Sequence, residues 1–113
     1  MIHMLSAFDL GDDEVMSDFQ VAYAAFVADL ENAGLIAFAS PLGARHADTP
    51  MDTDDTRAHT LFSILSFRDR AQLDAAYAHI EARAHPGTAS HGDMYARVRN
   101  AVFTCWEDIA QAG

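Results

Sequence analysis

The order in which strand-like and helix-like apolar patterns follow one another constrains the fold of this chain more than any other feature. Four short, mostly apolar segments have the length and composition of β-strands. They are residues 2–8, 35–42, 59–67 and 98–106. Between the first two segments, and again between the last two, apolar residues recur every three or four positions, which predicts two amphipathic helices. The predicted order is therefore β-α-β-β-α-β.

Turn and cap residues set the expected limits of the helices. The first helix carries its apolar stripe from Val15 onward, with Asp12 or Asp13 as N-cap and Gly34 just past its end. The second is expected to begin after Asp69, which has a glutamine three residues later as in a capping box, and to end before Pro86.

Two further segments complete the expected organisation. Residues 45–57 contain four aspartates and a proline, a composition typical of an exposed polar loop. Residues 88–97 are expected to add one or two turns of helix before the last strand.

The element order predicts an α+β fold with the ferredoxin-like βαββαβ arrangement. Right-handed crossovers place both helices on one face of a four-stranded antiparallel sheet, whose strands, numbered along the chain, have the order 4-1-3-2. We expect residues 1–113 to form this single domain, since their number suits one core.

The strands carry apolar residues on both faces. In the third strand, Leu61 and Leu65 have one parity while Phe62 and Ile64 have the other, and the last strand shows the same mixture. The helices cover one face only, so a bare apolar face would remain. We therefore expect a homodimer formed through the sheet face away from the helices.

A helix-covered sheet that dimerises through its bare face resembles the dimeric α/β-barrel superfamily, on element order, size and two-faced strands. That superfamily includes cofactor-free monooxygenases, haem-degrading enzymes, lactone isomerases and stress-responsive proteins. Haem-degrading members typically have an Asn on the first strand, a Trp on the third and a His on the second helix. Here only His79 matches that pattern, by element, so the resemblance implies fold and assembly but no reaction.

Charge and cysteine content narrow the expected partners. The chain carries a formal net charge of −10, which disfavours nucleic acid and membrane surfaces as partners. Cys105 is the only cysteine, and the first residues lack the pattern of a signal peptide, so we expect a cytoplasmic protein.

The histidines supply the candidate chemistry, because this side chain titrates near neutral pH. In the predicted topology His59, His85 and His91 gather at one end of the sheet, where they are candidate catalytic residues for proton transfer or could form part of a metal site. The alternative is that they are solvated histidines at turns and strand ends. No spacing matches a metal-binding motif, so no metal site is predicted, and the cofactor, if any, is unknown.

Four other residues are candidate ligand-binding residues. Arg45 could bind an anionic group, or it could pair with the loop aspartates instead. Tyr23 and Tyr77 lie on the predicted buried stripes, where they could line a pocket for a flat apolar ligand or simply pack in the core; Tyr95 carries a hydroxyl that needs a partner.

These residues leave two functions open. One is a small-molecule-binding protein or enzyme with a pocket between helices and sheet, and the other is a noncatalytic dimeric module with a stress-related or regulatory role. Whether the chain is an enzyme is not decided by the sequence. A cavity of about 300 Å³ or more between helices and sheet, with His59 or Arg45 pointing into it, would favour the first, and a filled core would favour the second.

Overall fold

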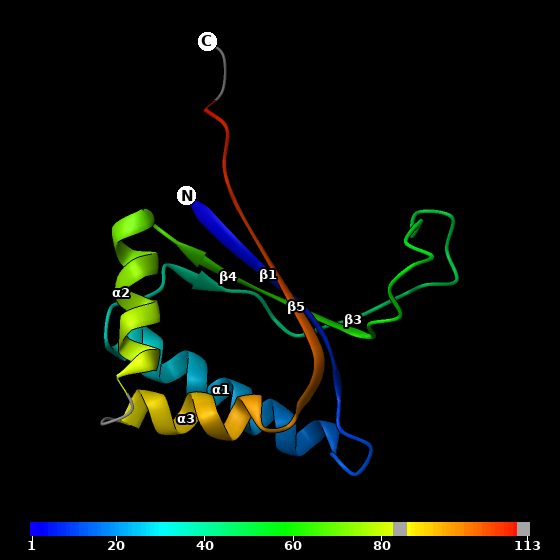
Figure 1. Ribbon diagram of the computed structural model, residues 1–113, viewed down its shortest axis with the longest axis horizontal. Helices are drawn as coiled ribbons and strands as arrows, with labels where there is room; N and C mark the ends of the chain where they lie inside the picture. The colour runs from blue at the N-terminus through cyan, green and yellow to red at the C-terminus, as the bar shows by residue number, and fades with distance from the viewer. Residues whose placement is uncertain (83–85, 111–113) are drawn as a thin grey trace.

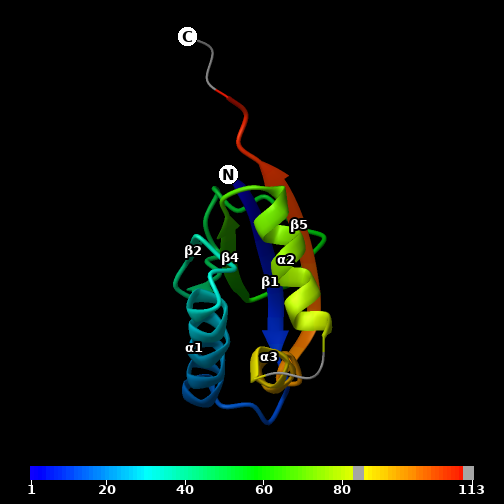
Figure 2. The same cartoon turned by 90° about the vertical axis from the view of Figure 1, so that its left-hand side faces the viewer.

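The protein consists of one antiparallel sheet with helices packed against one of its faces (Figures 1 and 2). The computed structural model describes residues 1–82 and 86–110, except for the side chains of residues 86–89. The strands are β1 (Ile2–Leu10), β2 (Phe38–Ala39), β3 (Gly43–Ala44), β4 (Leu61–Phe67) and β5 (Val98–Glu107). The helices are α1 (Met16–Asn32), α2 (Arg70–Glu81) and α3 (Pro86–Tyr95).

Strand β1 lies in the middle of the sheet. The order across the sheet is β2-β4-β1-β5, all pairs are antiparallel, and β3 pairs with β4 beside this path. The α+β ferredoxin-like architecture is the one expected, but the described residues contain five strands and three helices where four and two were predicted.

The extra strand arises because the segment 35–42 does not form one continuous strand. The backbone N–H of Ser40 donates to the carbonyl of Ile64 at 2.8 Å, but the N–H of Ile64 donates to the side-chain Oγ of Ser40 at 2.7 Å. Pro41 follows, and it has no N–H to continue the ladder. Strands β2 and β3 are therefore two short pairings with β4, separated by this interruption.

The N-cap predicted for α2 is confirmed, and the one predicted for α1 is not. Helix α1 has Val15 as its N-cap residue with no side-chain cap, so the predicted Asp12 or Asp13 cap is wrong. Asp69 caps α2 as predicted, accepting from the N–H of Gln72 at 2.9 Å. The amide nitrogen of the Gln72 side chain also donates to the carbonyl of Gly34, which ties the end of α1 to the start of α2.

Pro86 begins a helix instead of only ending one. Its fixed φ and missing N–H suit the first helical position. Helix α2 ends at Glu81 and α3 runs from Pro86 to Tyr95, so the predicted one or two turns before β5 are a full helix.

The core lies between the helices and the sheet in two clusters. The larger contains the buried residues Phe26, Leu30, Ile36, Leu65, Phe67 and Ala76. The smaller contains Phe8, Phe19 and Leu61. Met94 of α3 packs against both clusters, so α3 contributes to the same core as α1 and α2.

The sheet face away from the helices carries exposed apolar side chains. The register places Phe38 opposite Ser66, and Val102 opposite Ala7, on this face. Phe38 is 62% exposed, Val102 43% and Trp106 42%. Apolar side chains thus occupy both faces of the sheet.

Replacing Phe26 by alanine should lower the free energy of unfolding by about 2 to 5 kcal/mol, because Phe26 is buried in the larger cluster and alanine leaves a void. The exposed Val21 on the same helix provides the control, and Val21→Ala should change stability by no more than about 0.5 kcal/mol. Urea melts measure both. A Phe26→Ala loss equal to that of the control would mean that α1 buries a different stripe.

Candidate functional site

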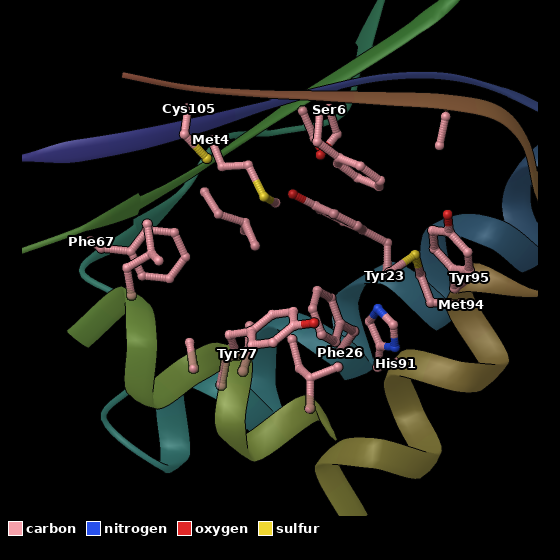
Figure 3. A pocket seen from close by; sticks show the side chains of 18 of the residues that line it. Met4, Ser6, Tyr23, Phe26, Phe67, Tyr77, His91, Met94, Tyr95 and Cys105 are labelled. Carbon is pink, nitrogen blue, oxygen red and sulfur yellow. The ribbon is translucent and has the colours of Figure 1, made fainter. Parts of the chain in front are cut away.

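A cavity of about 610 Å³ lies between the helices and the sheet. Side chains from β1, β4 and β5 form its roof, and side chains from all three helices form the rest of its wall (Figure 3). The lining is mostly apolar, which is typical of small-molecule sites of this size.

Aromatic rings form two neighbouring parts of the wall. At the inner end, Phe19 contacts Phe8 at a ring-centroid distance of 5.5 Å and Tyr23 at 6.3 Å. On the side of α3, His91 stacks on Tyr95 at 5.5 Å with an interplanar angle of 16°. The Tyr95 ring in turn stacks on Phe103 of β5 at 6.2 Å.

The cavity opens between α2 and the edge strand β5, where its lining residues are exposed. Tyr77, Arg70, Asp74 and Glu81 of α2 line this side. The Nε of Arg70 donates to Asp74 at 2.9 Å, so its charge is partly matched at the mouth. Two carboxylates and one guanidinium therefore give the mouth a net negative charge.

Burial keeps two ionisable groups of the cavity wall, His91 and Tyr23, uncharged near neutral pH. Burial lowers the pKa of His91, although the nearby Glu81 carboxylate acts in the opposite direction. Burial raises the pKa of Tyr23, and a hydrogen bond with the Ser63 side chain offsets part of that rise. The cavity thus presents a neutral imidazole and a neutral phenol.

Hydroxyl groups form a polar part of the cavity wall at the sheet. Ser6 of β1 and Ser63 of β4 are paired directly across the two strands and line the cavity. The Tyr23 hydroxyl donates to the carbonyl of Ser40 at 3.3 Å. Sequence reasoning missed both serines, although each interrupts a run of apolar residues at alternate strand positions, between Met4 and Phe8 and between Leu61 and Leu65.

Arg45 lies elsewhere, in a second hollow of about 210 Å³ on the other face of the sheet. It forms two hydrogen bonds with the Asp52 carboxylate, at 2.7 and 2.9 Å. It also donates to the backbone carbonyls of Asp54, Arg57 and His59. Its donors are thus used to hold the loop. This is the second of the two expected roles, in which Arg45 pairs with loop aspartates, and it leaves Arg45 no free donor with which to bind an anion.

His59 lines the same second hollow and ties strand ends together. It is buried, and its Nε2 donates to the carbonyl of Asn100 at 2.6 Å, which fixes the tautomer. Asn100 has a φ of 58°, in the left-handed region, close to the register shift between β1 and β5. Its amide also donates to Asp9, whose carboxylate accepts from the N–H and hydroxyl of Thr60.

The predicted candidates therefore divide between two places. His91, Tyr23, Tyr77 and Tyr95 line the large cavity. His59 lies in the second hollow, so the structure does not bring it together with His91. His85 is outside the described residues. The catalytic and ligand-binding roles of these residues stay predictions.

Metal-binding clusters and membrane-spanning helices are both absent from the described residues. No group of three or more His, Cys, Asp or Glu side chains among them is placed to hold a metal ion. None of the described helices has the length and apolar character needed to cross a membrane.

Comparison with known proteins identifies relatives by structure alone. No family model matches the sequence, and the search of curated proteins found no match. SnoaB, a cofactor-independent oxygenase from Streptomyces nogalater, is similar with a TM-score of 0.67 and 14% identity, covering 97% of this chain and 94% of that one.

Two other solved structures show the same likeness. The Arabidopsis thaliana protein At3g17210 has a TM-score of 0.68 and 10% identity, covering 99% of both chains. A dimeric ferredoxin-like protein of unknown function from Jannaschia sp. CCS1 has a TM-score of 0.65 and 17% identity, covering 95% of this chain and 98% of that one. This chain thus shares the fold of these proteins, of which the Jannaschia protein is described as dimeric and ferredoxin-like, and this confirms at the level of fold the resemblance expected from the sequence.

Proposed function

We propose that this protein binds an uncharged, largely apolar small molecule in the cavity between its helices and its sheet. The observation that carries the proposal is the cavity itself, about 610 Å³ with a mostly apolar lining and an open side. This volume is about twice the lower limit of about 300 Å³ for small-molecule sites. A purely structural module would gain stability by filling such a space.

The charges at the cavity favour a neutral ligand over an anionic one. Arg70, the one cation among the described lining residues, is exposed at the mouth and bonded to Asp74. Glu81 adds a second carboxylate there, while His91 inside is unprotonated near neutral pH. An anionic ligand would meet repulsion at the mouth and no cation inside.

An enzymatic role for the same cavity rests on His91. An unprotonated imidazole in the wall can accept a proton from a bound ligand, which is the first step of many reactions that need no cofactor. The likeness to SnoaB, described as a cofactor-independent oxygenase, is compatible with such chemistry. It is a likeness of fold, so the reaction itself is part of the proposal.

We also propose that the protein is a homodimer joined through the sheet face away from the helices. The exposed side chains of Phe38, Val102 and Trp106 support this, since they lie on one apolar face. The similar protein from Jannaschia is described as dimeric. The large cavity lies on the other side of the sheet and stays open in such a dimer.

The uncharged fluorescent probe N-phenyl-1-naphthylamine should bind the protein with a Kd on the order of 0.1 mM or tighter, as expected for an apolar ligand of its size. Filling the cavity with Ala101→Phe should weaken binding at least about ten-fold, because Ala101 lines the cavity. Ala75→Phe, at an exposed position of α2 outside the lining, is the control. Equal binding to both variants would show that the probe binds elsewhere.

Lowering the pH should destabilise the protein partly through His91. Its pKa is lower in the folded state than its ordinary value of 6.5, so the unfolded state binds the proton more readily. The contribution of His91 to stability is fully present above about pH 6.5. It is lost as the pH falls from there toward the pKa that His91 has in the folded state. Urea melts between pH 7.5 and 5 should show a smaller loss for His91→Gln than for the wild type.

The exposed loop residue His46 is the matched control for that experiment, and His46→Gln should keep the wild-type pH dependence. If His91→Gln also keeps it, His91 is not desolvated in the cavity wall.

Light scattering at micromolar concentration should give twice the chain mass of 12.3 kDa. Val102→Glu should shift the protein to the monomer, because it places a charge in the proposed interface. Val21→Glu, which changes another exposed valine, on α1, should leave the dimer intact. A wild-type mass of one chain would contradict the proposed dimer.

A further inference from the structure

Two buried serines lie side by side in the roof of the large cavity. Ser6 is 8% exposed and Ser63 5%, and both are on the helix-facing side of the sheet. The register pairs them directly across β1 and β4. Their neighbours on that face, Met4, Phe8 and Leu65, are apolar, so the hydroxyls stand alone in an apolar surface.

The hydrogen bonds of the two serines differ. The Ser63 hydroxyl bonds to the phenol of Tyr23. The Ser6 side chain makes no hydrogen bond within the part of the chain that the structure describes, and its hydroxyl stays in contact with the open space of the cavity. Figure 3 shows the side chains of Ser6 and Tyr23 directed to the same part of the cavity.

Packing alone does not account for Ser6. A hydroxyl in an apolar wall adds nothing to the packing, and an apolar residue at this strand position would bury more apolar surface. Positions that break the local pattern without a structural gain are characteristic of functional sites. The unused hydrogen-bonding capacity of Ser6 faces the space in which a ligand would lie.

We infer that Ser6, Ser63 and Tyr23 form a polar subsite that selects ligands carrying one uncharged oxygen, a carbonyl or a hydroxyl, on an otherwise apolar body. The inference rests on the proposed function and adds the class of ligand to it. A serine hydroxyl donates to a carbonyl or accepts from a hydroxyl equally well. A hydrocarbon of the same shape leaves Ser6 unpaired, and a carboxylate meets no cation here.

The aromatic rings in the cavity wall indicate the shape of the rest of the ligand. Rings from Phe19 and Tyr23 on one side and from His91 and Tyr95 on the other suit a flat body, since aromatic groups stack on them. The oxygen then lies toward the sheet, and the ring system extends toward the mouth between α2 and β5.

Equilibrium dialysis with naphthalene, 2-naphthol and 2-naphthoate tests the inference, since these probes share one ring system. The wild type should bind 2-naphthol about five-fold or more tighter than naphthalene, as one additional hydrogen bond gives, and should bind 2-naphthoate more weakly than 2-naphthol. In Ser6→Ala the preference for 2-naphthol over naphthalene should fall at least about three-fold, and in Ser6→Ala/Ser63→Ala it should disappear. Naphthalene should bind these variants at least as well as the wild type.

Ser66→Ala is the matched control, because Ser66 is a buried serine of β4 on the opposite face, bonded to His3. It should keep the wild-type preference, and urea melts confirm that each variant is folded. Equal binding of naphthalene and 2-naphthol by the wild type would overturn the subsite while leaving the cavity as a binding site. Binding of neither probe, together with failure of N-phenyl-1-naphthylamine, would overturn the proposed function as well.

Discussion

The pairing of β1 with β4 in the middle of the sheet is the constraint on which the rest of this structure depends. Their register places Ile2 opposite Phe67 and Phe8 opposite Leu61, and it turns these four side chains toward the helices. A slip of one residue would move every side chain of one strand to the other face. The core clusters, the Ser6–Ser63 pair and the apolar outer face all follow from this one register.

The cavity results from how the helices meet that sheet. Helix α1 contributes Phe19 and Phe26 to the two core clusters, while the lining residues on the side of α2 and β5, such as Tyr77 and Phe103, are exposed. Aromatic side chains line the space without filling it. The same sheet therefore serves two purposes in our account: one face holds a ligand, and the other joins a second copy. Because the two faces are separate, changes to one should leave the other intact.

The sequence predicted the elements that depend on local patterns. The amphipathic stripe containing Phe26 and Leu30 is buried, and the Asp69 cap is formed. The break at Ser40 was not predicted, because it depends on a side chain that replaces a backbone group on a neighbouring strand. The length of helix α3 was underestimated, because Pro86 is compatible with the start of a helix as well as with the end of one.

For the candidate site, helical periodicity placed Tyr23 and Tyr77 on the stripes that face the sheet, and both line the cavity, although Tyr77 is 65% exposed. The separation of His59 from His91 could not be predicted, because both come near the same end of the sheet but lie on different sides of it. Strand parity would not have separated them, because His59 has the same parity as the inward-facing Leu61 but precedes the start of β4. The serines could have been found by strand parity, as polar residues at inward positions of apolar strands.

A titration followed by two-dimensional NMR of the backbone amides tests the central claim most directly, because it locates a ligand without assuming where it binds. With 2-naphthol as the ligand, our account predicts the largest shift changes at Ser6 and Ser63 and around His91. Changes centred on Arg45 and His59, in the second hollow, would contradict it.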